Sequence, residues 1–197
     1  MNLVERVKRI LLSPKTEWEV IDAERTSIQE LYTRYIMPLA AIGPIAQLIG
    51  TTVFGVPLPF VGTYRVPIGS AITQAIVGYL LSLAGTYVLA LIIDALAPTF
   101  SARRSQIEAL KVAAYSMTAS WLAGIFGLIP ALSILGLLGL YSLYLLYLGL
   151  PVLMRAPREK AAAYSAVVII IGIVLWMVIA AIAAMFLSIP GAGRAVP

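Results

Sequence analysis

The sequence contains no cysteine and no histidine. Their absence excludes thiolate nucleophiles, Ser-His-Asp triads, haem ligation, disulfides and zinc sites built from these residues. Charge is also scarce, since only 12% of the 197 residues are charged, against roughly a quarter in soluble domains. No phosphate-binding loop of the Gly-Lys-Ser type and no metal-ligand cluster is recognisable, so we expect no metal and no cofactor.

Apolar residues make up 61% of the sequence. The longest charge-free stretch runs for 43 residues, from Val112 to Met154. As one α-helix it would reach ~65 Å at ~1.5 Å per residue, about twice the ~30 Å hydrocarbon layer of a bilayer, so it must fold back as a hairpin. The apolar runs are continuous rather than alternating, which excludes a β-barrel. The sequence therefore predicts an all-α, polytopic membrane protein.

Proline, glycine and charged residues divide residues 27–197 into five predicted spans, which form a transmembrane bundle. Capping-box patterns at Ser27–Glu30 and Ser105–Glu108 predict the starts of the first and third spans. We expect Pro38 and Pro44 to kink the first span. Three prolines and two glycines between residues 55 and 67 predict a loop rather than a strand. The predicted spans cover residues 28–52, 68–97, 106–127, 131–150 and 161–189.

Residues 1–26 precede the bundle and have an amphipathic pattern of their own, with apolar residues at helical spacing and basic residues opposite. Ser13-Pro14 ends the first helix, and the Thr16–Glu19 capping-box pattern opens a second. These helices either pack under the bundle as a floor or lie in the cytoplasmic interface, where they recognise lipid or a partner. The candidate contact residues are Arg6, Lys8, Arg9 and Trp18, together with Arg103 and Arg104 of a later loop.

Lysine and arginine are unevenly placed between the spans. Twelve lie in the amino-terminal segment and around the loops after the second and fourth spans, and only Arg65 and Arg194 lie on the other side. Because basic loops stay in the cytoplasm, we expect the amino terminus inside and the carboxyl terminus outside a bacterial inner membrane. This placement also accounts for the net charge of +5, so we expect no nucleic-acid partner.

Three segments carry a resemblance to a known family: LLSPKTEWEVI (11–21), ALKVAAYSMTASWLAGIFGLIP (109–130) and LLGLYSLYLLYLGLPVLM (137–154). They resemble bacterial members of the Yip family, five-span relatives of the Ypt/Rab-interacting proteins of eukaryotes. The resemblance covers nearly the whole chain and implies a five-helix domain with a cytoplasmic amino terminus. It leads us to expect a proline in the YSMTAS stretch, where this sequence has Ala119. It implies little about activity, because a prokaryotic member has no Rab partner.

Asp94 is the only acidic residue within the depth of a predicted span, and Lys111 lies at a similar level on the next, antiparallel span. We therefore predict that the two residues pair. Tyr87 shares a helical face with Asp94, and Tyr115 and Thr118 share one with Lys111, so the five residues would form a polar seam. Intramembrane ionisable residues are costly and are functional candidates. The seam is either a hydrogen-bonded clamp near the headgroups or part of a proton or ion path.

Small residues form two stripes in the third predicted span, which permit close helix contact within one subunit or in a homo-oligomer. The stripes are Ser116, Ser120 and Gly124, and Ala119, Ala123 and Gly127. No positioned pair of titratable groups around a pocket is recognisable, so we predict no catalytic site. The leading interpretation is a non-enzymatic protein that organises the lipid bilayer or binds membrane-protein partners. The alternatives are a small channel or transporter using the polar seam, and a membrane enzyme acting on lipid.

Overall fold

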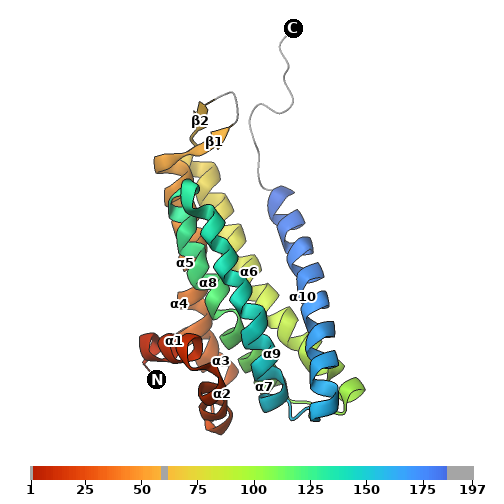
Figure 1. The fold of residues 1–197 in the computed structure, drawn as a ribbon. Helices are drawn as coiled ribbons and strands as arrows, with labels where there is room; N and C mark the ends of the chain where they lie inside the picture. Colours follow the sequence, from red (N-terminus) through yellow and green to blue (C-terminus); the bar gives the residue numbers. More distant parts are fainter. Residues whose placement is uncertain (1, 59–61, 186–197) are drawn as a thin grey trace.

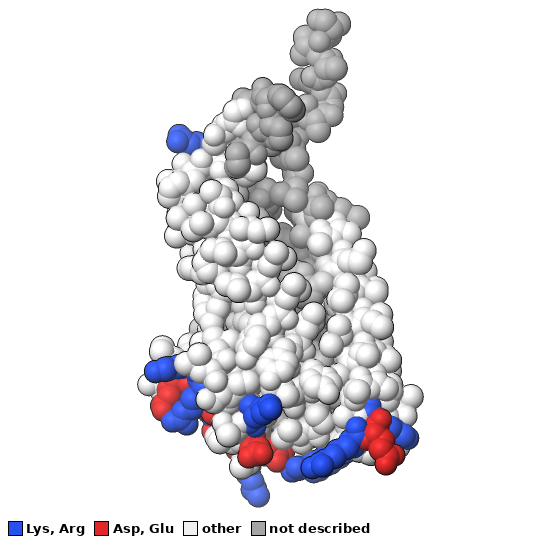
Figure 2. Space-filling model, in the orientation of Figure 1, with Lys and Arg blue, Asp and Glu red and all other residues white. Residues whose placement is uncertain are grey.

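The computed structural model describes residues 2–58 and 62–185, and its long helices run side by side in a bundle (Figure 1). Two short helices, α1 (Leu3–Leu12) and α2 (Pro14–Ala23), lie across one end of the bundle. Strands β1 (Val56–Leu58) and β2 (Gly62–Tyr64) form a hairpin at the opposite end. Lysine, arginine and acidic residues gather at the α1–α2 end (Figure 2). We call these two ends the charged end and the hairpin end.

The bundle follows the chain in successive helical stretches. The first stretch comprises α3 (Ile28–Leu31), α4 (Met37–Ala40) and α5 (Ile42–Ile49), with π-helical turns at Tyr32–Ile36 and Gly50–Phe54. The second is α6 (Ile68–Leu96), which ends in a 3₁₀ turn at Ala97–Phe100. Next come α7 (Gln106–Ser116), α8 (Thr118–Ala123) and the 3₁₀ segment η4 (Gly124–Leu128). The remaining stretches are the 3₁₀ segment η5 (Pro130–Leu140) continued by α9 (Tyr141–Leu153), and α10 (Arg158–Met185).

Several stretches of the described chain match the membrane spans predicted from the sequence. Four are long and apolar enough to cross a membrane: Ile28–Phe54, Ile68–Phe100, Pro130–Leu153 and Arg158–Ala183. They confirm the predicted all-α, multi-pass fold. Residues 186–189 of the last predicted span lie outside the described residues.

The predicted third span is not one continuous helix, because it breaks at Met117 between α7 and α8. The break forms without the proline expected near Ala119. The Thr118 hydroxyl donates to the Tyr115 carbonyl at 2.7 Å, and such a local side-chain bond competes with the regular helical ladder. Neither helical piece alone has the length of a span, so a total of five spans stays a prediction.

Two prolines shape the first span. Each lacks the N–H that an α-helix bonds to the carbonyl four residues earlier. The π-helical turn Tyr32–Ile36 ends just before Pro38, and the helix breaks at Ala41, three residues before Pro44. The first span is therefore a series of short helical pieces rather than one uniform helix.

The segment predicted as a loop contains a short antiparallel hairpin, in which Val56 pairs with Tyr64. The prediction of a loop without a strand was wrong because a two-stranded ribbon consists only of edges, where proline is tolerated. Gly55 and Gly62 have positive φ angles of 76° and 95°, a conformation that favours glycine. At Gly55 an added Cβ would also lie only 2.6 Å from the Thr63 side chain.

The large buried side chains concentrate at the charged end, where α1 and α2 share one core with the bundle. Ile10, Trp18 and Ile21 of the two short helices are completely buried there. Towards the hairpin end, several buried residues are small, such as Ala46 and Ala71. The bundle therefore has a well-filled core at one end and a looser interior at the other.

The small-residue stripes pack inside the subunit. Gly124 lies so close to Gly43 of α5 that an added Cβ at Gly124 would be 2.7 Å from Gly43 Cα. The Ser120 hydroxyl donates to the Gly139 carbonyl at 3.0 Å, where the two backbones also approach closely. These contacts agree with the alternative in which the stripes pack within one subunit. A homo-oligomer stays a prediction.

Candidate functional site

The α1–α2 pair is folded by the junction between its two helices. Ser13 follows the last residue of α1, and Pro14 occupies the first position of α2, where its missing N–H removes no helical bond. The prediction that Ser13-Pro14 ends the first helix is confirmed. Thr16 lies inside α2, so the prediction that a Thr16–Glu19 capping box opens the second helix was wrong.

Arg6 of α1 is buried, with 5% of its surface exposed, between two carboxylates. Its two terminal nitrogens donate to Glu17 of α2 and to Glu24, the residue that follows α2. Its guanidinium carbon lies 5.8 Å from the centre of the Tyr115 ring. Burial alone would lower the pKa of Arg6, but the hydrogen bond and charge of Glu24 raise it above the ordinary value. Arg6 therefore stays charged and ties α1, α2 and α7 together.

Aromatic side chains surround Arg6 on the bundle side. Trp18 packs edge-on against Tyr115 with 6.2 Å between ring centres, and Tyr35 of the first span packs against Tyr115 at 4.5 Å. The Tyr35 and Thr118 hydroxyl oxygens lie 2.7 Å apart. Trp18 also lies over Gly149 of α9, where an added Cβ would be 2.6 Å from Trp18 Cη2. Tyr115 and Thr118 thus connect the short helices and the first span to α7 and α8.

Lys111 of α7 is 2% exposed and holds the end of α2. Its Nζ donates to the Glu24 carbonyl at 2.7 Å, the Ile21 carbonyl at 3.3 Å and Glu108 Oε1 at 3.1 Å. A cation at the carboxyl end of a helix satisfies carbonyls that have no partner within the helix and complements the helix dipole. Lys111 therefore acts as a cap for α2 that is supplied by the bundle.

Asp94 lies in a different cluster, at the end of α6. Its Oδ2 accepts from Arg104 at 3.1 Å, and the nearby Tyr87 hydroxyl accepts from Gln106 at 2.7 Å. The predicted Asp94–Lys111 pair was wrong, because each residue has its own oppositely charged partner. Matched depth did not bring them together, since Lys111 is directed at α2. The predicted polar seam is thus divided between two separate clusters.

The predicted lipid or partner contacts include both buried and exposed residues. Arg6 and Trp18 are buried, so predicting them as surface contacts was wrong. Lys8 and Arg9 are exposed on α1, and Arg9 pairs with Glu5 one turn away. In the loop after α6, Arg103 and Arg104 are also exposed. Of the six predicted contact residues, these four are accessible to a lipid or a partner.

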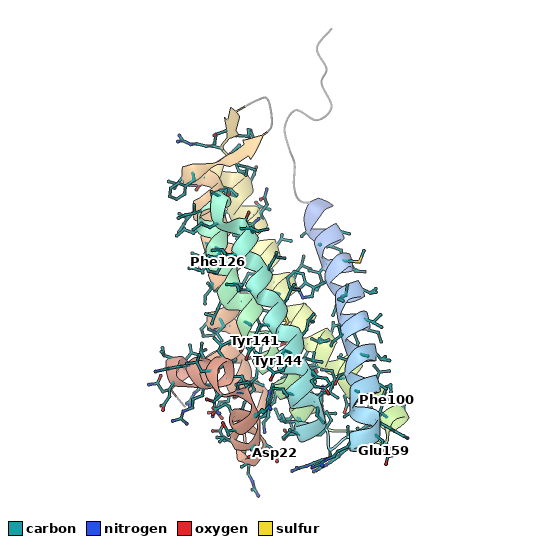
Figure 3. All side chains as sticks on the ribbon, in the orientation of Figure 1. Asp22, Phe100, Phe126, Tyr141, Tyr144 and Glu159 are labelled. Atoms are coloured by element: carbon teal, nitrogen blue, oxygen red, sulfur yellow. The ribbon has the colours of Figure 1, made fainter. Side chains whose placement is uncertain are left out.

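The outer face of α1 is apolar at both of its ends. Val4 is 74% exposed and Leu12 is 71% exposed. The carboxyl end of α1 is fixed against the bundle, because the Tyr141 hydroxyl donates to the Leu11 carbonyl at 3.1 Å, and Figure 3 shows Tyr141 and Tyr144 beside α1. Tyr141 is the first residue of α9 and lies near the middle of the apolar stretch Pro130–Leu153, so the carboxyl end of α1 is fixed against the side of that stretch.

A polar cavity of about 240 Å³ lies beside the Arg6 cluster, in the angle between the linker after α2 and the start of the first span. Arg34 in its wall pairs with Glu30 at 3.0 Å, and Arg25 is exposed. We call this cavity the charged-end cleft. It presents charged side chains of both signs on a linker that Arg6 and Lys111 hold in place. Its lining residues are Glu24, Arg25, Thr26, Glu30, Leu31, Arg34 and Tyr115.

Most acidic side chains at the charged end form ion pairs, and Glu19 and Glu159 are the exceptions among the described residues. Among residues 2–58 and 62–185, no three His, Cys, Asp or Glu side chains are grouped so as to hold a metal ion. Asp22 at the end of α2 pairs with Arg155 at 2.8 Å, which joins α2 to the loop between α9 and α10. The charged end therefore offers hydrogen-bonding and ionic groups to a binding partner.

These features define a multi-pass α-helical membrane protein whose amino-terminal helix pair is held on the bundle by buried charges. The chain belongs to the Yip1 domain family, and it matches that domain over residues 8–179. This match confirms the family predicted from the sequence segments.

Two curated relatives are similar to the chain along most of its length. It is 28% identical over 173 residues to inner membrane protein YohC of Escherichia coli strain K12, which covers 86% of this chain and 89% of the relative. The same values hold for inner membrane protein YohC of Escherichia coli O6:H1. No solved structure matches the chain.

Proposed function

We propose that this protein is a non-enzymatic protein of the bacterial inner membrane that binds a partner protein at the charged-end cleft, on the cytoplasmic side. The observation that carries this proposal is the fixed position of the linker after α2. Arg6 binds the side-chain carboxylate of Glu24, and Lys111 binds the backbone carbonyl of the same residue. A linker ordered in this way presents Arg25, beside Arg34 of the first span, without further loss of conformational entropy in the linker on binding, which favours affinity.

A photo-crosslinking residue at Thr26, inside the cleft, tests partner binding in membranes of the native host. We expect a protein adduct at Thr26 that disappears when Arg34 is changed to Glu. The matched control is Thr63, an exposed threonine of β2 at the hairpin end, where we expect no such adduct. Adducts with lipid alone at Thr26, or the same protein adducts at Thr63, would contradict the proposal.

Point substitutions are sharper here than deletion of residues 1–26. Deletion would remove Trp18 and Ile21 from the shared core and would leave Lys111 without two of its three acceptors. The loss of a partner would then be indistinguishable from unfolding of the charged end. The Arg34→Glu change affects an exposed side chain and leaves that core intact.

The orientation of the chain is part of the proposal. The uneven distribution of charge in Figure 2 supports a cytoplasmic charged end, by the preference of basic segments for the cytoplasm. The printed name of the E. coli relatives supports an inner-membrane location. Reporter fusions near Arg104 and Glu159 should therefore read as cytoplasmic, and fusions after residue 60 and at the carboxyl terminus should read as outside. A cytoplasmic carboxyl terminus would contradict either the orientation or the number of spans.

The division of the polar seam favours partner binding over ion transport. Asp94 and Lys111 lie in separate clusters at the charged end, each neutralised by its own partner. Transporter sites instead bring polar groups together near the middle of the membrane. We expect purified protein in liposomes to show no proton or cation flux that depends on Asp94. Flux that is lost in Asp94→Asn would support the transporter alternative against this proposal.

A further inference from the structure

A cavity of about 670 Å³, partly open to the surroundings, lies among the helices of the bundle, between the core at the charged end and the β hairpin. Residues of α5, α6, α8, η5 and α10 form its walls. Along α6 it extends from Gly78 to Leu89, about 16 Å at ~1.5 Å per residue. The described residues that line it include no ionisable side chain. It is therefore distinct in position and in chemistry from the charged-end cleft.

Glycines create much of this space. Gly78 on α6 and Gly136 on η5 both line the cavity, and an added Cβ at either position would meet no atom within 4 Å. Close-packed protein interiors contain few voids larger than a water molecule. A space of this size between helices leaves wall atoms without protein neighbours, so a molecule that fits it gains dispersion contacts with those walls. The cavity thus has the properties of a binding site for a bulky group.

The polar groups of the cavity change along its length. In the deeper part, the Trp121 indole N–H donates to Ser82 Oγ at 3.2 Å, and the Thr86 hydroxyl donates to the Ser82 carbonyl at 2.8 Å. These groups satisfy one another. Nearer the hairpin end, the polar side chains of Gln47 and Ser133 line the cavity, and both residues are exposed. The cavity therefore combines an apolar depth with a polar rim.

We propose that the cavity binds one acyl chain of a phospholipid from the leaflet at the hairpin end, with the lipid ester group at Gln47 and Ser133. Much of its wall belongs to helices long and apolar enough to cross a membrane, so lipid is the surrounding solvent at this depth. Apolar cavities exclude water, and pockets for small molecules have volumes of about 300–1,000 Å³. The polar rim matches the ester group, and the apolar depth matches the hydrocarbon chain. The proposal does not depend on partner binding at the charged end.

Tryptophan fluorescence can report the occupant, because Trp121 and Trp176 line the cavity whereas Trp18 lies in the core at the charged end. Trp176 is exposed, so it is changed to Phe to remove quenching by surrounding lipid. The full-length Trp176→Phe protein is delipidated in detergent. It is then reconstituted in phosphatidylethanolamine–phosphatidylglycerol vesicles with or without phosphatidylcholine brominated on one acyl chain. We expect the brominated lipid to quench part of the tryptophan emission of this protein. That quenched part should be absent when Trp121 is also changed to Phe.

Cavity-filling variants then distinguish a bound chain from surrounding lipid. Gly78→Leu and Gly136→Leu, made separately, should each lose most of the quenching, and Gly78→Ala should lose less. Gly69→Leu is the matched control, because Gly69 is on the same helix and has equal space for a Cβ but does not line the cavity. It should keep the quenching of the parent. Thermal unfolding of every variant tests whether the fold is retained. Gly78→Ala adds only one methyl group, so it should disturb the fold least. Quenching that persists in all the filled variants, or no quenching of Trp121 in the parent, would overturn the proposal.

Discussion

Replacing Lys111 with methionine tests whether the bundle holds α2 in place through one buried cation. Methionine keeps a stem of similar length and removes only the charge and the donors. Three acceptors would lose their partner, namely two carbonyls at the end of α2 and the Glu108 carboxylate. We therefore expect Lys111→Met to destabilise the protein and to loosen the α1–α2 pair before the rest of the bundle.

The expected magnitude follows from the burial of the two ionic partners. Removing one member of a buried ion pair costs about 3–5 kcal/mol, because the remaining charge is left uncompensated. Lys111 is 2% exposed, but the side chain of Glu108 is 21% exposed and can regain water. The lower end of that range, about 3 kcal/mol, is therefore appropriate. At roughly 2–4 °C per kcal/mol for a chain of this length, the melting temperature should fall by about 6–12 °C.

The assay is thermal unfolding of the purified protein in detergent, followed by tryptophan emission, with limited proteolysis of α1–α2 as a second readout. Lys15→Met is the matched control, because Lys15 is an exposed lysine on α2. Surface changes of this kind stay within about 0.5 kcal/mol. Equal melting temperatures for Lys111→Met and Lys15→Met would refute the view that Lys111 holds α2.

Three further substitutions probe the same end of the molecule. Arg6→Met should cost about 3–5 kcal/mol, seen as a lower melting temperature, because it leaves a buried carboxylate uncompensated; a change as small as that of an exposed arginine would contradict this. Gly149→Ala should displace the Trp18 ring, shift its emission and cost about 1–3 kcal/mol, because the Trp18 ring already fills the space that the added methyl group needs. An unchanged emission spectrum would count against that contact. Combining Asp94→Asn with Lys111→Met should give additive losses of stability within about 0.5 kcal/mol, because the two residues have separate partners. A double mutant that loses clearly less than the sum would restore the pairing predicted from the sequence.

The apolar pattern predicted much of the helical framework because its cause is local. The second predicted span, residues 68–97, agrees closely with α6, which runs from Ile68 to Leu96. Ser27 caps the first span as predicted, since its hydroxyl accepts the Glu30 N–H at 3.1 Å. At Ser105 the predicted helix start is confirmed, since α7 begins at Gln106, but the predicted capping bonds are wrong, because the Ser105 side chain makes none and Glu108 binds Lys111 instead. A local motif fails where a tertiary partner competes for one of its groups.

The candidate site was harder to predict because its partners are distant along the chain. Lys111 binds backbone carbonyls 87 and 90 residues away, and backbone carbonyls carry no sequence signal. Helical periodicity gives the depth of a charged residue, but not which neighbouring helix it faces. Arg6 was assigned to an outer basic face for the same reason, because its partners Glu17 and Glu24 lie 11 and 18 residues away, beyond the helix break at Ser13.

The 3₁₀ segment η5 has a consequence for how this protein fits the thickness of its membrane. Its 11 residues rise about 22 Å at roughly 2.0 Å per residue, whereas an α-helix of that length rises about 16 Å. The stretch from Pro130 to Leu153 therefore gains about 6 Å of reach over a uniform α-helix of the same 24 residues. That gain is equivalent to about four extra α-helical residues. Conversion of η5 to α-helix would shorten this stretch relative to α6 and α10, so a thinner bilayer would favour the α form and a thicker one the 3₁₀ form.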